Sequence, residues 1–395
     1  MKICFYALRP FDELAYCRQF SAQYGIDFTW TADYPTPENV SLAEGCDAVC
    51  MTPCDMGAAM VDRFAALGVK YLLCRSIGYD HVDRARAKAH GMRVANVGYT
   101  PNGVANYAIM LMLMATRRMG HILKRAEVQD YSLKGKMGKD LSACTVGVIG
   151  AGKIGRTVLK HLSGFGCKLL TYDVYQNPEA AALAEFVPLE ELYARSDVIT
   201  LHTNATAENH HLLDAAAFAK MRDGVVIVNT ARGSLIDPDA LIDAIESGRV
   251  GAAALDVLEN ENGLYYYNHA GDVLQNRELA LLRSFPNVIV SPHTAFYTDE
   301  DVASMVQGAF EALRCFAAGG RRRAGRPVSL CLRRLRRLLP RPAGHCAVRA
   351  GPVPAGPAAA PAARPGGRGV LPRDRRPAAG ALPQALPPHR KLPLF

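Results

Sequence analysis

Hydrophobic and polar positions alternate along the first 319 residues in a pattern that predicts short strands separated by helices. The stretches 60–67 and 81–90 repeat apolar positions at helical spacing. Strands that alternate with helices form βα units on a parallel sheet, so we expect an α/β fold that begins with a small open sheet. The strands predicted for this sheet are residues 2–7, 48–51, 71–74 and 94–97.

A long apolar helix, predicted over residues 102–118, separates these strands from a second series that we expect to form a larger parallel sheet. We expect two domains, each built on a doubly wound sheet and joined by this helix. The strands predicted for the second series are residues 145–150, 168–172, 198–201, 225–229, 252–256 and 288–291.

Length and composition indicate a cytoplasmic protein with sizeable cores. The chain has 395 residues, 49% of them hydrophobic, and its longest unbroken apolar run, 108–115, is far shorter than a membrane span. Its eleven cysteines form no CxxC pair, which favours reduced thiols. Cys46, Cys50 and Cys54 are evenly spaced, but Cys50 lies in a predicted strand and Pro53 would interrupt a helix, so we expect no metal site.

The net charge of +9 comes from the C-terminal part of the chain. Residues 320–395 carry 17 Lys and Arg against one acid, together with 14 of the 24 prolines, and we expect them to be disordered. A basic arm that binds nucleic acid is one interpretation. The other, which we favour, is a stretch without selected function, such as frameshift-derived sequence, because the change is abrupt and falls inside a helical pattern at 301–318.

A glycine motif follows the strand at 145–150 and opens a helix. Gly150, Gly152 and Gly155 would allow a tight turn and the close approach of a pyrophosphate to the helix N-terminus. Asp173 ends the next predicted strand, where a carboxylate accepts hydrogen bonds from ribose hydroxyls and repels a 2′-phosphate. The motif and Asp173 together predict an NAD site and favour NAD over NADP.

Three further residues stand just after predicted strands, at the sheet edge where ligands collect. Arg232 could bind a small carboxylate through its guanidinium, and His293 could donate a proton to a carbonyl. Glu261 could pair with that imidazole and stabilise its charged form. Each residue alone also has a simpler explanation. Arg232 could form a surface ion pair, His293 could be structural, and Glu261 could be a solvated acid.

The order and spacing of these residues resemble the D-isomer-specific 2-hydroxyacid dehydrogenases, and within them the D-lactate dehydrogenase branch. The resemblance rests on the glycine motif and on the segments NTARGSLID, LDVLENE and SPHTAFYT, and extends back through RSIGYDHVD and YTPNGVANYA. The branch that reduces pyruvate in glycopeptide resistance is similar too. The resemblance stops near Ala318, where such chains usually finish with a helix that returns to the substrate domain.

The resemblance implies that residues 1–101, completed by about 298–319, form the substrate domain and residues 102–297 the NAD-binding domain. Both would be Rossmann-like, with the active site in the cleft between them. It assigns Arg232 to the substrate carboxylate and carbonyl, His293 to acid–base catalysis and Glu261 to partnering that histidine. It also implies a homodimer. Substrate contacts are expected from the backbone amides of Ile77 and Gly78 and from Tyr99, Phe296 and Tyr297. Cofactor contacts are expected from Gly150, Gly152, Lys153, Ile154, Gly155, Asp173, Thr230, Ala231, Asp256 and His293.

The predicted activity is therefore reduction of a small 2-oxoacid, most simply pyruvate, by NADH to the D-2-hydroxyacid. A D-2-hydroxyisocaproate or phenyllactate dehydrogenase is the alternative within this class. An NAD-sensing, corepressor-like binding protein is the alternative outside it, and a full set of Arg232, Glu261 and His293 argues against that alternative. We expect neither a nucleic-acid nor a membrane partner.

Overall fold

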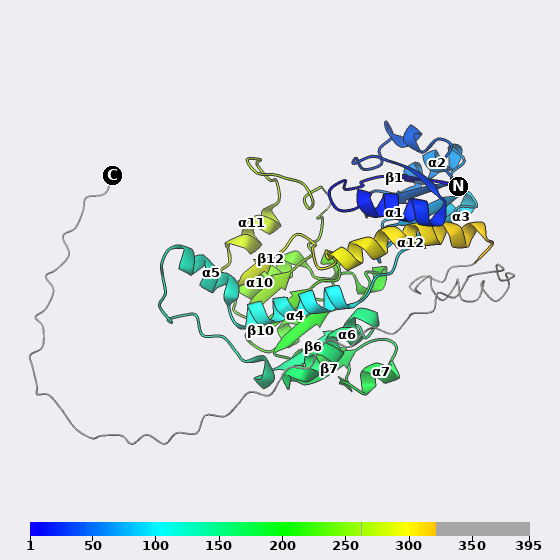
Figure 1. Ribbon diagram of the computed structural model, residues 1–395. Coiled ribbons are helices and arrows are strands. Elements are labelled where there is room, and N and C mark those ends of the chain that lie inside the picture. Colours follow the sequence, from blue (N-terminus) through cyan, green and yellow to red (C-terminus); the bar gives the residue numbers. More distant parts are fainter. Residues whose placement is uncertain (262, 321–395) are drawn as a thin grey trace, which may run out of the picture. The chain divides into compact units, whose positions relative to one another are not determined.

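The computed structural model describes residues 1–261 and 263–320, which contain two parallel sheets with helices on both faces (Figure 1). The fold prediction of an α/β protein with two doubly wound sheets is confirmed. The basic tail, residues 320–395, was predicted to be disordered. From residue 321 onward it lies outside the described residues. Among the helices described, none has the length and apolar character that a membrane crossing requires.

The first sheet has five parallel strands in the order β2-β1-β3-β4-β5. The chain moves outward from β1 to β2, then returns past β1 to build the other side, so the strand order reverses between β1 and β3. The strands are β1 (Lys2–Phe5), β2 (Asp27–Trp30), β3 (Ala48–Met51), β4 (Tyr71–Cys74) and β5 (Arg93–Asn96). The intervening helices are α1 (Leu14–Tyr24), η1 (Val40–Ala43), α2 (Ala58–Ala66) and α3 (Arg84–Ala89).

The last described helix, α12 (Asp299–Ala317), returns to this first sheet and lies beside α1 (Figure 1). Its N-terminus is capped by Thr298, whose hydroxyl accepts a hydrogen bond from the Asp301 amide at 3.2 Å. Phe310 is fully buried and its ring centre lies 5.5 Å from that of Phe5. One face of the first sheet is therefore closed by residues about 300 positions further along the chain.

The second sheet has seven parallel strands in the order β12-β11-β10-β9-β6-β7-β8. Strands β6 to β8 extend one way and β9 to β12 the other, so the strand order reverses between β6 and β9. The strands are β6 (Thr145–Ile149), β7 (Lys168–Tyr172), β8 (Glu185–Phe186), β9 (Val198–Leu201), β10 (Val225–Asn229), β11 (Val250–Leu255) and β12 (Val288–Val290). The helices among them are α6 (Lys153–Leu162), η3 (Ser163–Phe165), α7 (Pro178–Ala181), α8 (Leu189–Arg195), η4 (Ala207–Asn209), α9 (Ala215–Lys220), η5 (Gly233–Leu235), α10 (Pro238–Glu246) and α11 (Arg277–Ser284).

Helix α4 (Asn102–Thr116) packs on the second sheet, against β10, β11 and the neighbouring α6. Its buried face includes Ala108 and Met112, which belong to the same core as Val146 of β6. Helix α5 (Met119–Glu127) and the short helix η2 (Leu141–Ala143) follow before β6 begins.

Of the three evenly spaced cysteines, Cys50 lies in β3, as predicted, and Cys46 and Cys54 lie on either side of this strand. Cys50 faces the core that contains Phe5, whereas Cys46 and Cys54 belong to the core on the other side of the sheet. The three thiols therefore do not share a face. All nine cysteines in the described residues are free thiols.

Candidate active site

The glycine loop lies at the point where the strand order of the second sheet reverses. Gly150 has a φ of +97°, and a Cβ there would lie 2.6 Å from the carbonyl oxygen of His202. A Cβ on Gly155 would overlap the carbonyl oxygen of Gly150, so only glycine lets the helix approach the strand this closely. A Cβ on Gly152 would meet nothing within 4 Å, which leaves open space at the N-terminus of α6.

Asp173 stands directly after β7, beside this loop, and its carboxylate accepts two backbone hydrogen bonds. One comes from Ala151 of the glycine loop at 2.6 Å and the other from Tyr175 at 3.0 Å. The carboxylate is thereby fixed at the edge of the glycine loop. Loop and carboxylate fit the adenosine end of a dinucleotide, with room for a pyrophosphate and an acceptor for the ribose.

Lys153 and Ile154, also predicted to bind the cofactor, form the first turn of α6 immediately after this open space. Thr230 and Ala231 lie across the sheet, directly after β10. The Thr230 hydroxyl is buried and has no hydrogen-bond partner among the described residues, so it is available to a bound molecule. The Ala231 amide, by contrast, donates to Asn229 within its own turn at 2.9 Å.

Arg232 follows β10, and the structure places its guanidinium against Gly78 of the first sheet. A Cβ on Gly78 would overlap the Arg232 Nη2 atom. The same Nη2 lies 3.5 Å from Asp80, and Nη1 donates to the carbonyl of Ala231 at 2.7 Å. The Ile77 carbonyl accepts a hydrogen bond from Asn96 at 2.7 Å, which fixes the turn that carries Gly78. Arg232 and the 77–78 turn, predicted to act together, therefore meet in space.

His293 and Glu261 form a close pair, as the sequence predicted. The Nδ1 atom of His293 lies 2.5 Å from Glu261 Oε1, and Glu261 Oε2 accepts a hydrogen bond from the Leu258 amide at 3.1 Å. The pair is about three-quarters buried, with side-chain exposures of 22% and 24%. Because Glu261 engages Nδ1, Nε2 is the ring nitrogen of His293 that remains for a substrate.

Asp256 is fully buried and organises the segment that carries His293. Its Oδ1 accepts hydrogen bonds from the Ser291 hydroxyl at 2.6 Å and the Thr294 amide at 2.9 Å, and its Oδ2 accepts one from the Ala295 amide at 2.8 Å. In this structure the carboxylate, which we expected beside the nicotinamide, is engaged with its own chain.

Aromatic side chains surround the imidazole of His293. Phe296 lies edge-on to it, with ring centres 6.3 Å apart, and packs in a small core with Tyr99. Burial, followed by the nearby Asp301, raises the pKa of the Tyr99 hydroxyl, which therefore stays protonated near neutral pH. Tyr297 is 45% exposed and donates to Asp12 at 2.7 Å.

Sequence reasoning missed Tyr266, which contacts both rings of this group. Its hydroxyl donates to the His293 carbonyl at 2.9 Å, and its ring lies 6.5 Å from Phe296 and 6.3 Å from the imidazole. It also missed Gly233, where a Cβ would overlap the backbone of Leu258. No local pattern distinguishes either residue, because both act through contacts between distant segments.

Comparison with known proteins agrees with this arrangement. The NAD-binding domain of the D-isomer specific 2-hydroxyacid dehydrogenases matches residues 109–295. An aromatic 2-oxoacid reductase of Clostridium sporogenes is 40% identical over 310 residues, which are 78% of this chain and 93% of that protein. The D-lactate dehydrogenase of Escherichia coli is 38% identical over 318 residues, 79% of this chain and 96% of that one.

The crystal structure of a D-lactate dehydrogenase from Treponema pallidum superposes with a TM-score of 0.73 at 31% identity, covering 82% of this chain and 99% of that one. Fold and cofactor domain thus define an NAD-dependent oxidoreductase. The chain belongs to the D-isomer-specific 2-hydroxyacid dehydrogenase family.

Proposed function

We propose that this protein reduces pyruvate to D-lactate with NADH, in a cleft formed by the 77–78 turn on one side and the segments after β10 to β12 on the other. The observation that supports this most is the packing of Arg232 on Gly78, with a closely paired His293 and Glu261 held on the neighbouring segments. A cation and an imidazole are the two groups that a 2-oxoacid needs for binding and protonation.

Arg232 binds the substrate carboxylate and polarises its carbonyl in this proposal, together with the Ile77 and Gly78 amides. The guanidinium already lies 3.5 Å from a carboxylate, that of Asp80, which is exposed. A substrate carboxylate would offer Arg232 a better-aligned, less solvated partner. A substrate carboxylate would therefore replace Asp80 as the partner of Arg232.

His293 delivers the proton to the developing alkoxide through Nε2. Glu261 holds the ring by Nδ1 and stabilises the imidazolium, and its own orientation is set by the Leu258 amide. In the reverse direction the same imidazole, once neutral, accepts the hydroxyl proton.

The cofactor supplies the hydride when bound. We assign its pyrophosphate to the turn of Gly150, Gly152 and Gly155 with Lys153 and Ile154, its adenosine ribose to Asp173, and its nicotinamide end to Thr230 and Ala231 beside His293. Asp256 supports this end by fixing the segment that carries His293. The Asp173 carboxylate, fixed by two backbone amides, would repel a 2′-phosphate and so makes NADH the preferred reductant.

The size of the substrate side chain is the least constrained part of the proposal. Phe296 and Tyr266 form an aromatic wall beside His293, Tyr99 packs against the same small core as Phe296, and the similar Clostridium sporogenes protein is named for aromatic 2-oxoacids. An aromatic wall contacts a phenyl group as readily as it excludes water from a methyl group. Reduction of phenylpyruvate is therefore the second candidate activity.

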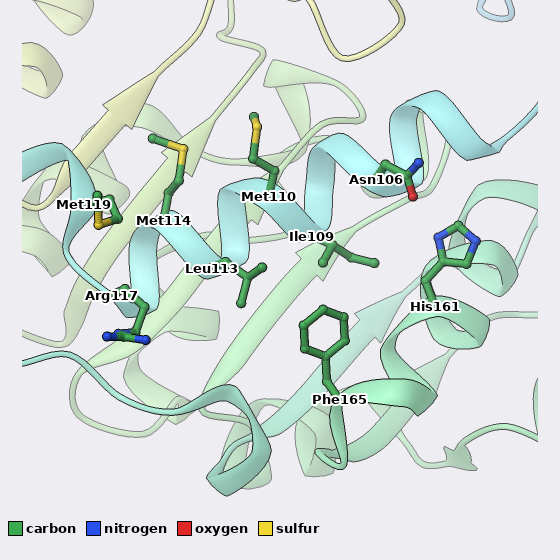
Figure 2. A pocket seen from close by; sticks show the side chains of 9 residues that line it. All are labelled: Asn106, Ile109, Met110, Leu113, Met114, Arg117, Met119, His161 and Phe165. Carbon is green, nitrogen blue, oxygen red and sulfur yellow. The ribbon is translucent and has the colours of Figure 1, made fainter. Parts of the chain in front are cut away.

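We also propose that the protein is a cytoplasmic homodimer that joins through the surface groove along α4 (Figure 2). Ile109 and Leu113 of α4 point toward Phe165 across this groove, while Met110 and Met114 extend along its far side. Met110 and Phe165 are 41% and 38% exposed, and together with Ile109, Leu113 and Met114 they make the lining of this groove largely apolar, as an interface would be.

The deciding experiment measures NADH oxidation by the full-length protein with pyruvate, 2-oxobutyrate, 2-oxoisocaproate and phenylpyruvate. We expect the highest kcat/KM with pyruvate, a D-configured product, and a clear preference for NADH over NADPH. A highest kcat/KM with phenylpyruvate would replace the substrate by the second candidate. Formation of the L-isomer, or no turnover while NADH still binds, would refute the proposed reaction.

A further inference from the structure

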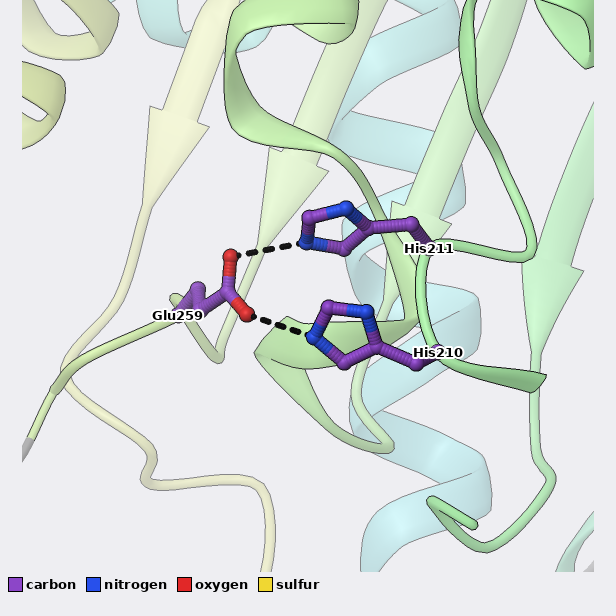
Figure 3. Close-up of side chains that lie close together, drawn as sticks. All are labelled: His210, His211 and Glu259. Carbon is purple, nitrogen blue, oxygen red and sulfur yellow. Dashed lines mark hydrogen bonds and ion pairs between the residues drawn. The ribbon is translucent and has the colours of Figure 1, made fainter. Parts of the chain in front are cut away.

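Two adjacent histidines and a glutamate form a cluster that the proposed reaction does not use. His210 and His211 follow η4, and Glu259 lies on the segment after β11 (Figure 3). The two imidazole rings stack with their centres 3.9 Å apart, and both point toward the same carboxylate. Each carboxylate oxygen takes one ring: Oε1 lies 3.1 Å from His210 Nε2 and Oε2 lies 2.9 Å from His211 Nε2.

The backbone holds the rings in this convergent arrangement. His211 has a φ of 52°, a left-handed conformation that is unfavourable for a side chain with a Cβ. Its amide donates to the carbonyl of Ser234 at 2.8 Å, which fixes the strained residue to the segment after β10. Strain of this kind persists where the surrounding structure enforces it and is concentrated at functional sites.

The donor atoms are spaced as ligands of a single metal ion are. All three lie within 4.8 Å of one another, and an ion about 2.0–2.1 Å from each nitrogen and oxygen can sit among them after small side-chain movements. Two imidazoles and a carboxylate form the donor set of many zinc sites, with a fourth position left for water.

Asp237 places a carboxylate near the other ring nitrogen of His211, where metal-binding histidines usually have an outer partner. Its Oδ2 lies 3.7 Å from His211 Nδ1, on the side of the ring away from Glu259. Its Oδ1 caps α10 by accepting hydrogen bonds from the amides of Asp239 and Ala240 at 3.1 and 3.2 Å. The carboxylate is thus held where it favours a proton on Nδ1 of His211 and leaves Nε2 as the ligand atom.

We propose that His210, His211 and Glu259 bind one divalent transition-metal ion, of which Zn²⁺ fits the donor set best. The ion would join the 210–211 segment to the segment that also carries Glu261. Only Asn260 separates Glu259 from Glu261, the partner of His293. The site is thus distinct from the catalytic cluster but lies on the same turn of chain.

The test is titration of the purified, EDTA-treated and dialysed full chain with ZnCl₂ by isothermal calorimetry. We expect one equivalent per chain to bind with a Kd of about 10 µM or tighter, a level that three preformed ligands readily reach. H210A and E259Q should each weaken binding by at least about 30-fold, since each removes or neutralises a ligand. D237N keeps a good helix cap and should weaken binding by about tenfold through the outer partner alone.

The matched control is H90A. His90 lies 2.6 Å from Asp62, and the two form an exposed histidine–carboxylate pair outside the proposed site. Replacing His90 should therefore leave Zn²⁺ binding unchanged. Co²⁺ in place of Zn²⁺ should give the absorption of a nitrogen and oxygen site without a sulfur charge-transfer band. A sulfur band, or equal Kd values for the wild type, H210A and E259Q, would overturn the proposal.

Discussion

Gly78 shows how one missing side chain makes room for a residue of the proposed active site. The Arg232 guanidinium occupies the volume that a Cβ at position 78 would fill. Because Arg232 comes from the second sheet and Gly78 from the first, the contact joins the two halves of the proposed site.

Gly78→Ala should therefore reduce activity without unfolding the protein. The added methyl group would push the guanidinium away from the 77–78 turn, and we expect kcat/KM for the 2-oxoacid to fall by at least about 100-fold, since misplacement by about 1 Å has this effect. Steady-state kinetics give kcat/KM, and fluorescence titration gives the affinity for NADH.

The control is Gly152→Ala, at a position whose added methyl would meet no protein atom. There we expect weaker NADH binding instead, because the methyl enters the space assigned to the pyrophosphate. Unchanged kcat/KM in Gly78→Ala would contradict the role given to Arg232 and this turn.

Helices α4 and α12 meet at their N-terminal ends, and a buried acid lies at the junction. Asp301 is 1% exposed, its carboxylate lies close to Thr100 and Thr298, and a Cβ on Gly103 would overlap Oδ2. Burial, and to a smaller extent Glu300, raises the pKa of Asp301 to about 6.

This raised pKa predicts a stability that depends on pH. The unfolded carboxyl ionises near its usual pKa of about 4, so the free energy of unfolding decreases as the pH rises from about 4 to about 6. Asp301→Asn removes this loss. We expect it to raise the free energy of unfolding by about 1–3 kcal/mol at pH 8 and by about half as much at pH 5.

Urea unfolding at the two pH values measures the effect, with Asp299→Asn as the control. Asp299 is exposed on the same turn, and the pKa of its carboxyl is lowered because the carboxylate accepts a hydrogen bond from the Glu300 amide. Its replacement should therefore not stabilise the protein at pH 8. A gain for Asp301→Asn that is equal at pH 5 and pH 8 would show that its charge is not the cause.

Among the elements, the strands made mostly of apolar residues could be predicted from the sequence. Strands β3, β4, β7, β9 and β10 have the bounds that their apolar runs predicted. Strand β2 was missed because its four residues are all partly or fully exposed, and β8 because two residues give no period. Helix α1 was missed as well; only Cys17 and Phe20 are buried in it, so its apolar face is narrow.

The proposed active site could likewise be predicted only in part from the sequence. Arg232, Glu261 and His293 could be chosen because parallel strands bring their carboxyl ends to one edge. The approach of Gly78 to Arg232 and the hydrogen bond from Tyr266 to the His293 carbonyl depend on segments far apart in the chain. No spacing along the sequence encodes those contacts.

For the molecule as a whole, the proposed dimer makes a prediction about mass in solution. Met110→Asp would place a charge in the apolar groove along α4 that we expect a second copy to cover (Figure 2). Light scattering should give twice the chain mass of 42.7 kDa for the wild type and a monomer mass for the variant at micromolar concentration.

Leu42→Asp is the control, because Leu42 is 50% exposed on η1 beside the first sheet, outside this groove. It should remain a dimer. If the wild-type protein is monomeric at all concentrations, the proposed interface at the groove is wrong.

The return of α12 to the first sheet has a consequence for synthesis on the ribosome. Ile3 and Phe5 leave the ribosome about 300 residues before Val306 and Phe310, which cover them. At about 5–20 residues per second this interval lasts about 15–60 s. The second sheet is contiguous in the chain and can close during translation, whereas the first-made strands finish folding last. Until then their apolar face is open to chaperones and to aggregation.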